Sequence, residues 1–355
     1  MDAKTSIVAA ALAGIVMIVA MKIPLPGIDI GAAAAQMSAS SGAMSRLSIF
    51  AIGLTPLYTA LILTEIGRLF LSQRGDPRSP PGRIETAIVG VIALAVTVLQ
   101  GYGVVQAMRS AGLLDQDFVI PAVATYMGVT AVLIFLSLHI RLAGFRTGFW
   151  AMWLVPILLT LPTEFAYAID LTRTGVIPGM SWLVFAAYVL LSIAAIVTMA
   201  SLWKSAWSDN ADAHGATGVE AREILIWPPV LASSIATYFL TFIAIVAPDL
   251  FNAFDTVVLQ GAVLVIAALL IPVFVTAYWR QSAAMLRDGA PRALIITVIA
   301  CVQILLLVAG SVLNLLRVMP VGIGYTAFLA LTLVAISLFS ARAGRFAATA
   351  DAVNP

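Results

Sequence analysis

Ten runs of mostly apolar residues recur along this chain. Each is about 20 residues long, which is the length that an α-helix needs to cross the hydrocarbon core of a bilayer. The runs lie at about 5–23, 48–71, 84–108, 118–139, 147–167, 180–203, 225–247, 256–279, 292–315 and 321–341. Of the 355 residues, 62% are hydrophobic and 10% are charged, whereas a soluble domain carries about 25% charged residues. The sequence therefore predicts an all-α polytopic membrane protein with ten transmembrane helices.

Ten spans place both ends of the chain on one side of the membrane, and the basic residues indicate which side. Connections on the side of the N-terminus hold 14 of the 19 Lys and Arg residues, and the other side holds 5. Cytoplasmic loops carry an excess of Lys and Arg, so we expect both termini in the cytoplasm. The first run is expected to be retained, because the Lys22-Ile23-Pro24 that follows it is not a small-residue cleavage site.

Five spans in each half have a consequence for symmetry, since the second half then begins on the opposite side of the membrane. Halves at 1–172 and 173–355 would be inverted repeats if they share a fold. Pro56 in the second span and Pro228-Pro229 in the seventh lie at matching positions and precede hydroxyl-bearing residues. This pattern indicates a central pathway, although Pro is also common in membrane helices for structural reasons alone.

Two short motifs flank a polar, Ala- and Ser-rich segment between the first two spans. PLPGID ends the first span at residues 24–29, and SGAMSRLSIFAIGLTP leads into the second at residues 41–56. The pair resembles the SecY family of protein-conducting channels, in which a Pro-x-Pro-Gly-x-Asp turn, a short plug and a Ser-Arg-x-Ser-Ile-Phe-Ala-x-Gly-x-x-Pro segment follow in this order. Further similarity lies at 80–105, 139–162, 224–239 and 321–341, with Arg146-Thr147-Gly148 in place of the family's usual Gly-Asn-Gly.

The resemblance implies a SecY-like fold, in which two inverted five-helix halves enclose an hourglass pore. A narrow ring of apolar side chains excludes water and ions by dewetting, yet yields to a passing polypeptide. By position, the residues of this pore constriction would be Leu54, Tyr58, Trp153, Val230 and Leu329. The lateral gate between the second and seventh spans would include Pro56, Thr59, Pro229, Ser233 and Ser234, and the plug, at about 30–41, would include Ile30, Ala34 and Met37. Tyr58 and Trp153 depart from the family's aliphatic ring, so packing or anchoring at the membrane interface is the alternative for both.

The resemblance also implies partners, namely a polypeptide substrate, a SecE-like single-span membrane protein, and a ribosome or motor ATPase that docks on long basic loops. The loop after the sixth span, 205–224, is polar and slightly acidic, which predicts a flexible loop that lacks a docking surface. The loop after the eighth span keeps Arg280, Arg287 and Arg292 for docking, but the positive-inside rule explains these residues without any partner. The reduced loops argue against ribosome or motor docking, and they indicate a specialised paralogue in a bacterial inner membrane.

Motifs for catalysis or for phosphate binding are missing from the sequence, including HExxH, G-x-S-x-G and the phosphate loop. Two isolated His residues and the single Cys301 form no recognisable metal site. We therefore predict a channel subunit without cofactor and without enzymatic activity. The alternative is an inverted-repeat secondary transporter of a small molecule or peptide, which needs polar groups at mid-span that are scarce here. An intramembrane enzyme is a third hypothesis.

A few polar residues fall within the predicted spans. Glu65 and Arg68 stand three residues apart near the end of the second span, which predicts a local ion pair. Four amides, Gln100, Gln260, Gln303 and Asn314, are predicted to be buried and to form hydrogen bonds between helices.

Overall fold

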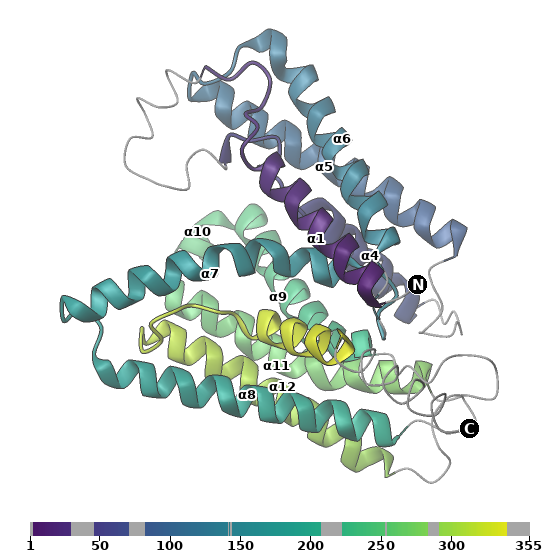
Figure 1. Cartoon of the computed structure of the whole chain (residues 1–355), viewed down its shortest axis with the longest axis vertical. Coiled ribbons are helices and arrows are strands. Elements are labelled where there is room, and N and C mark those ends of the chain that lie inside the picture. The colour runs from purple at the N-terminus through teal and green to yellow at the C-terminus, as the bar shows by residue number, and fades with distance from the viewer. Residues whose placement is uncertain are drawn as a thin grey trace. The chain divides into compact units, whose positions relative to one another are not determined.

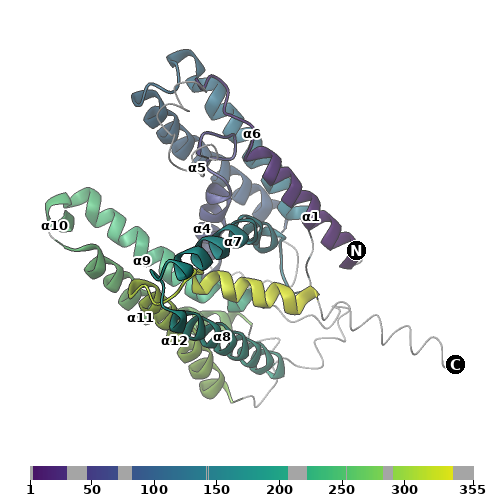
Figure 2. The same cartoon turned by 60° about the vertical axis from the view of Figure 1, so that its left-hand side comes forward.

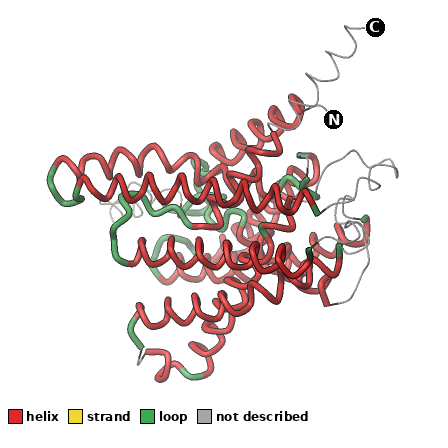
Figure 3. The backbone as a smooth tube through the Cα atoms, turned by 90° about the horizontal axis from the view of Figure 1, so that it is seen from below, coloured by secondary structure: helices red, strands yellow, loops and turns green. Residues whose placement is uncertain are grey.

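The computed structural model describes residues 3–29, 46–70, 82–140, 142, 144–206, 222–252, 254–282 and 291–338. Within these residues the backbone consists of helices and loops, without a named strand (Figure 3). The long helices are α1 (Ala3–Ala20), α4 (Thr55–Phe70), α5 (Arg83–Ser110), α6 (Val119–His139), α7 (Phe149–Arg173), α8 (Gly179–Ser205), α9 (Trp227–Val246), α11 (Thr256–Gln281), α12 (Arg292–Leu315) and a final helix, Tyr325–Leu338. The short ones are α10 (Pro248–Asn252) and the 3-10 helices η1 (Gln116–Phe118) and η3 (Arg222–Leu225). Each of the predicted spans therefore contains a helix.

The second predicted span differs most from the structure. Helix α4 begins at Thr55, although the apolar run suggested a start near residue 48. Residues 48–54 instead form turns, because Ser48 is bridged to Pro24 and the N–H of Gly53 donates to the carbonyl of Phe50 at 2.8 Å. Helix α7, in contrast, is longer than predicted, since it extends to Arg173, six residues beyond the predicted end at 167. It continues through Pro156 and Pro162.

The outer surface of the helices is apolar. Large side chains such as Leu99, Leu190 and Leu269 are more than two-thirds exposed, which a soluble protein does not tolerate over so many residues. Seven helices in the described part of the chain are long and apolar enough to cross a membrane, and Val8–Ala20 and Tyr325–Leu338 are shorter apolar helices. The chain is thus an all-α, multi-pass membrane protein.

The chain divides into two compact units. Unit 1 comprises Met1–Phe70, Pro80–Arg141 and Thr147–Trp153, and unit 2 comprises Leu71–Ser79, Leu142–Arg146 and Leu154–Pro355. These contacts place a boundary within α7, after Trp153. The division after residue 172 rests on the count of spans and stays a prediction.

In unit 1, helices α4, α5 and α6 pack against one another, and α5 and α6 lie side by side in two views (Figures 1 and 2). The buried hydroxyl of Thr97 on α5 donates to the backbone carbonyl of Ala93 and lies 3.0 Å from the hydroxyl of Thr130 on α6. At Gly148, just before α7, an added Cβ would lie 2.2 Å from the Cβ of Ile140, so the turn between α6 and α7 closes only around glycine. Close approach of small residues is how membrane helices gain contact without a hydrophobic driving force.

In unit 2, α11 packs against both α9 and α12, and α12 also packs against α8 (Figure 1). The hydroxyl of Tyr188 on α8 donates to the carbonyl of Leu306 on α12 at 3.2 Å. The ring fits there because residue 310 is glycine, at which an added Cβ would lie 2.3 Å from the Tyr188 oxygen. Tyr188 also contacts the Phe328 ring edge-on, at a centroid distance of 5.9 Å, which ties the final helix to α8.

Candidate functional site

The two motifs that flank the Ala- and Ser-rich segment are joined by backbone hydrogen bonds in unit 1. The N–H of Leu25 donates to the carbonyl of Leu47 at 2.9 Å, and the N–H of Ile49 donates to the carbonyl of Ile23 at 3.0 Å. Pro24 and Ser48 form an antiparallel bridge at the centre of this pairing, and a second bridge joins Ile28 to Leu114. The two motifs, which are separated in the sequence, are therefore direct neighbours in the structure.

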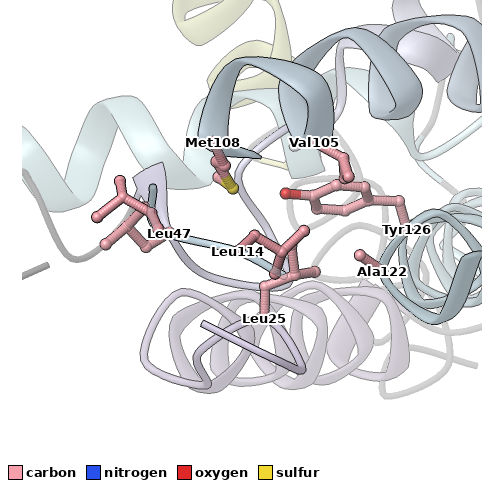
Figure 4. Packing of buried hydrophobic residues seen from close by; sticks show 8 residues of the cluster. Leu25, Leu47, Val105, Met108, Leu114, Ala122 and Tyr126 are labelled. Carbon is pink, nitrogen blue, oxygen red and sulfur yellow. The ribbon is translucent and has the colours of Figure 1, made fainter. Parts of the chain in front are cut away.

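A hydrophobic cluster supports the paired motifs. Leu25, Leu47 and Leu114 converge with Met108 and the Tyr126 ring (Figure 4). On the side of the first motif, Gly27 has a φ of +82°, and a Cβ there would lie 2.1 Å from the ring of Phe118. Backbone with positive φ is accessible to glycine at little cost, so the glycine of PLPGID is required both by its conformation and by its neighbour.

The second motif continues directly into α4, which carries Pro56, Tyr58 and Thr59 of the predicted pore and gate and directly follows Leu54. Leu54 is buried, and its carbonyl accepts from the N–H of Tyr58 at 2.9 Å. Pro56 lies in the first turn of α4, where N–H groups lack partners within the helix, so it breaks no hydrogen bond. The hydroxyl of Thr59 donates to the carbonyl of Thr55 at 3.0 Å.

An aromatic chain connects Tyr58 with Trp153. The Tyr58 ring stacks on Phe149 at 6.1 Å, Phe149 meets Trp150 edge-on at 5.3 Å, and Trp150 meets Trp153 edge-on at 5.7 Å. Phe149 and Trp150 are fully buried, whereas Tyr58 and Trp153 are partly exposed at the two ends. The resemblance pointed to the two ends, Tyr58 and Trp153, but not to the two rings between them, although the Phe-Trp-x-x-Trp spacing of residues 149–153 is a signal in the sequence.

In unit 2, the predicted gate and constriction residues lie in the first turns of α9. Pro229, Val230 and Ser234 are buried, and Ser233 is partly exposed. Leu329, in the final helix, is fully buried. Whether Val230 and Leu329 form one ring with Leu54, Tyr58 and Trp153 stays a prediction.

The burial of side chains changes along the length of helix α9. Trp227–Ala236 is almost entirely buried, whereas most side chains from 237 onward are exposed, among them Tyr238, Phe239 and Phe242. The hydroxyl of Thr237 donates to the carbonyl of Ser233, and that of Thr241 to the carbonyl of Thr237. The exposed half therefore presents apolar side chains together with hydroxyl groups that are already bonded to their own helix.

The remaining predicted site residues are only partly described. The plug residues Ile30, Ala34 and Met37 and the docking residue Arg287 lie outside the described residues. Arg280 and Arg292 are exposed at the end of α11 and the start of α12. Within the described part of the chain, no group of three or more His, Cys, Asp or Glu side chains is close enough to hold a metal ion.

Predictions for polar residues inside the spans had mixed outcomes. Glu65 and Arg68 form the predicted ion pair at 2.5 Å, with the carboxylate buried. Gln303 is buried and makes a hydrogen bond to another element, as predicted. Gln260 and Asn314 are exposed, so their predicted burial is wrong. Apolar neighbours in the sequence do not reveal which face of a lipid-facing helix an amide occupies.

The last residues of the loop at 205–224, which was predicted to be flexible, are buried and helical. Arg222, Glu223 and Ile224 are buried, and they belong to η3, which leads into α9. Polarity alone suggested solvent exposure for these charges. Their burial depends on partners far away in the sequence, which no local pattern reveals.

The described helices define a class of protein, that of polytopic membrane proteins with a SecY-like fold. Three solved structures are similar over 96% of this chain and 93% of their own, each at 10% sequence identity. They are a SecY protein whose plug domain stabilises the closed state of the translocation channel, canine Sec61 in a ribosome–channel complex from the endoplasmic reticulum, and a protein-conducting channel, with TM-scores of 0.54, 0.55 and 0.57. The SecY-like fold predicted from the two motifs is confirmed.

Sequence comparisons add no further relative. No protein-family model matches the chain, and no curated protein sequence matches it. The similarity is therefore one of fold, spread over nearly the whole length of both partners.

Proposed function

We propose that this protein is a channel subunit that passes polypeptide segments across a bacterial inner membrane or releases them sideways into it. The observation that carries the proposal is the coverage of the fold similarity, because nearly the whole chain aligns with nearly the whole of three protein-conducting channels. Both termini then lie in the cytoplasm, as the excess of Lys and Arg on that side indicates.

In this proposal Leu54, Tyr58, Trp153, Val230 and Leu329 form the pore constriction. The aromatic chain from Tyr58 to Trp153 supports this role on the unit 1 side, since its two partly exposed ends are backed by fully buried rings. Rigid apolar rings would close a narrower aperture than aliphatic side chains do. Such an aperture suits one extended segment at a time.

The lateral gate lies between α4 and α9 in this proposal, with Pro56 and Thr59 on one side and Pro229, Ser233 and Ser234 on the other. The hydroxyl bonds of Thr59 and Thr237 to their own helices support it, because surfaces without unpaired donors separate in lipid at little cost. A substrate helix that leaves through the gate moves apolar surface from water into lipid, which is favourable by about 25 cal/mol per Å². The step needs no chemical energy from the channel.

Partners follow from the same reasoning. A SecE-like single-span protein would clamp the two halves, and Ile30, Ala34 and Met37 would belong to a plug. Arg280, Arg287 and Arg292 are the basic residues left for a cytoplasmic partner, and the short loops indicate a specialised paralogue that docks neither a ribosome nor a motor ATPase in the usual way.

Site-specific photocrosslinking tests the proposed function. A photoreactive amino acid replaces Tyr58 or Trp153 in turn, and stalled nascent chains of graded hydrophobicity are presented to membranes that contain the protein. We expect covalent adducts from both positions with the hydrophobic chains. Control positions are Leu99 on α5 and Leu190 on α8, which are 74% and 68% exposed on lipid-facing helix surfaces and should give no adduct.

Absence of adducts from Tyr58 and Trp153 across all substrates, or equal yields from the control positions, would contradict the proposal. Uptake of a small solute driven by a proton or sodium gradient in proteoliposomes would favour the transporter instead.

A further inference from the structure

Two charged residues are buried directly before α9. Arg222 and Glu223 are 9% and 6% exposed, and they form η3 together with Ile224 and Leu225. Burial of a charged group is costly unless hydrogen bonds or opposite charges compensate for it. The surrounding structure must therefore provide hydrogen-bond or ion-pair partners for both side chains.

The prolines of α9 create a need for a donor at the same place. In a continuous helix the carbonyl of Leu225 would accept from the N–H of residue 229, but residue 229 is proline and has no N–H. The side-chain amide of Gln303 on α12 takes this place, because its Nε2 donates to the Leu225 carbonyl at 2.9 Å. Gln303 is fully buried, so this bond lies in a region from which water is excluded.

Glu223 binds the turn between α6 and α7 through both its backbone and its side chain. Its N–H donates to the carbonyl of Gly144 at 3.0 Å, and its Oε2 accepts from the N–H of Arg146 at 2.6 Å. A carboxylate that accepts a backbone N–H makes a charge-assisted bond, which is shorter and stronger than a neutral one. This pair of bonds fixes the turn relative to the start of α9 within unit 2.

Arg222 extends in another direction. Its Nη1 donates to the hydroxyl of Ser337 at 3.0 Å, and that hydroxyl donates in turn to the carbonyl of Leu333 at 2.8 Å. Ser337 belongs to the final helix and is 1% exposed. Three neighbouring residues thus connect the start of α9 to the turn before α7, to α12 and to the final helix.

We propose that Arg222, Glu223 and Gln303, here called the α9 anchor, are positioning residues. They hold the N-terminal end of α9 fixed while its C-terminal half, from Thr237 onward, is free to move. The contrast along α9 supports this role, since eight of its first ten residues are buried and most residues from Thr237 onward are exposed. The inference rests on the proposed function in one respect, which is that α9 moves when the gate opens. With the anchor in place, that movement is a pivot about residues 222–226.

Cysteine labelling tests the anchor without any substrate. In a Cys301→Ser background, Ala232→Cys reports access to the buried half of α9 and Thr237→Cys reports access to the exposed half. A membrane-permeant maleimide should label Thr237→Cys rapidly and Ala232→Cys slowly. Adding Glu223→Gln or Gln303→Leu should raise the labelling rate at Ala232→Cys about tenfold, which corresponds to about 1.4 kcal/mol in the opening equilibrium.

Matched controls separate loss of the anchor from loss of a polar group in general. Glu164→Gln on α7 and Gln260→Leu on α11 make the same chemical changes at exposed positions and should leave the Ala232→Cys rate unchanged. Ala267→Cys on α11, which is fully buried, should stay slow in every variant. Ser337→Ala removes the hydroxyl that accepts from Arg222, with little change in volume, and it serves if a stronger variant fails to fold.

A second readout concerns gating. Proteoliposomes that carry an anchor variant should leak ions faster than those with the unaltered protein, because an unfixed α9 closes the pore less well. The inference is overturned if Ala232→Cys labels no faster in the anchor variants and in Ser337→Ala than in the controls, or if Ala267→Cys accelerates equally, which would indicate general loosening. Since labelling needs no nascent chain, missing photocrosslinks with intact labelling differences would contradict the proposed function alone.

Discussion

The chain is held in place before α4 and before α9 by different kinds of interaction. Each leads into a helix with proline in its first turn, and each carries residues of the proposed gate. Before α4, the chain is held by backbone pairing with residues 23–25 and by an apolar cluster (Figure 4). Before α9, it is held by buried charged and amide side chains that reach three other elements.

The two kinds of anchoring tolerate different substitutions. Backbone pairing depends on conformation, so it is sensitive at glycine positions and tolerant of side-chain chemistry. Polar side-chain anchoring depends on matched donors and acceptors, so removal of one member leaves its partner buried without that hydrogen bond. Substitutions in the two regions should therefore fail in distinct ways.

The largest effect is expected for Arg222→Met. The substitution removes the guanidinium, which is a buried charged group and the donor to the Ser337 hydroxyl. The free energy of unfolding should therefore fall by about 3 kcal/mol. Arg173→Met is the control, since Arg173 is 76% exposed in its ion pair with Asp170 and should change stability by about 0.5 kcal/mol or less. Denaturant unfolding in mixed micelles measures both, and equal effects would remove the distinction drawn for α9.

An intermediate effect is expected for Gly27→Ala, before α4. The substitution places a Cβ against Phe118 in backbone of positive φ, which should lower the free energy of unfolding by about 2 kcal/mol. Gly112→Ala isolates the contribution of conformation, because Gly112 has a φ of +71° and nothing within 4 Å of an added Cβ, and it should lose about 1 kcal/mol. If both variants lowered the free energy of unfolding equally, the contact with Phe118 would not contribute to the loss.

The smallest effect is expected for Ser48→Ala. The buried Ser48 hydroxyl accepts from the N–H of Phe50 at 3.2 Å, and its removal should lower the free energy of unfolding by about 1 kcal/mol. Ser110→Ala, on the exposed end of α5, removes only a hydroxyl bonded to its own helix and should be close to neutral. A loss at Ser48 as large as that at Arg222 would mean that side-chain chemistry dominates before α4 as well.

Much of the fold could be predicted from the sequence, because the physics of a bilayer leaves few choices. A helix lies in each apolar run, and the Glu65–Arg68 pair follows from spacing on one helix. The start of α4 was misplaced because the pairing of Ser48 with Pro24 crosses more than twenty residues of sequence. Local hydrophobicity has no means of reporting such a contact.

The candidate site was predicted in part, and the reasons are again physical. Tyr58 and Trp153 were assigned to the constriction from the resemblance, and that role stays a prediction, while Phe149 and Trp150, whose rings join theirs, were missed. The α9 anchor was missed because a charged residue beside a polar loop normally faces water. Only the missing N–H of Pro229 pointed to an outside donor such as Gln303.

The central claim is that residues of the two units form one constriction, and a paired-cysteine experiment tests it directly. In the Cys301→Ser background, a short bifunctional maleimide is applied to Tyr58→Cys combined with Val230→Cys. Ser201→Cys with Ser205→Cys is the positive control, since both positions are exposed and lie one turn apart on α8, and the single-cysteine variants Tyr58→Cys and Val230→Cys are the negative controls. We expect a crosslink between positions 58 and 230 that abolishes nascent-chain adducts from Trp153. No crosslink between 58 and 230, under conditions in which the positive control reacts fully, would contradict it.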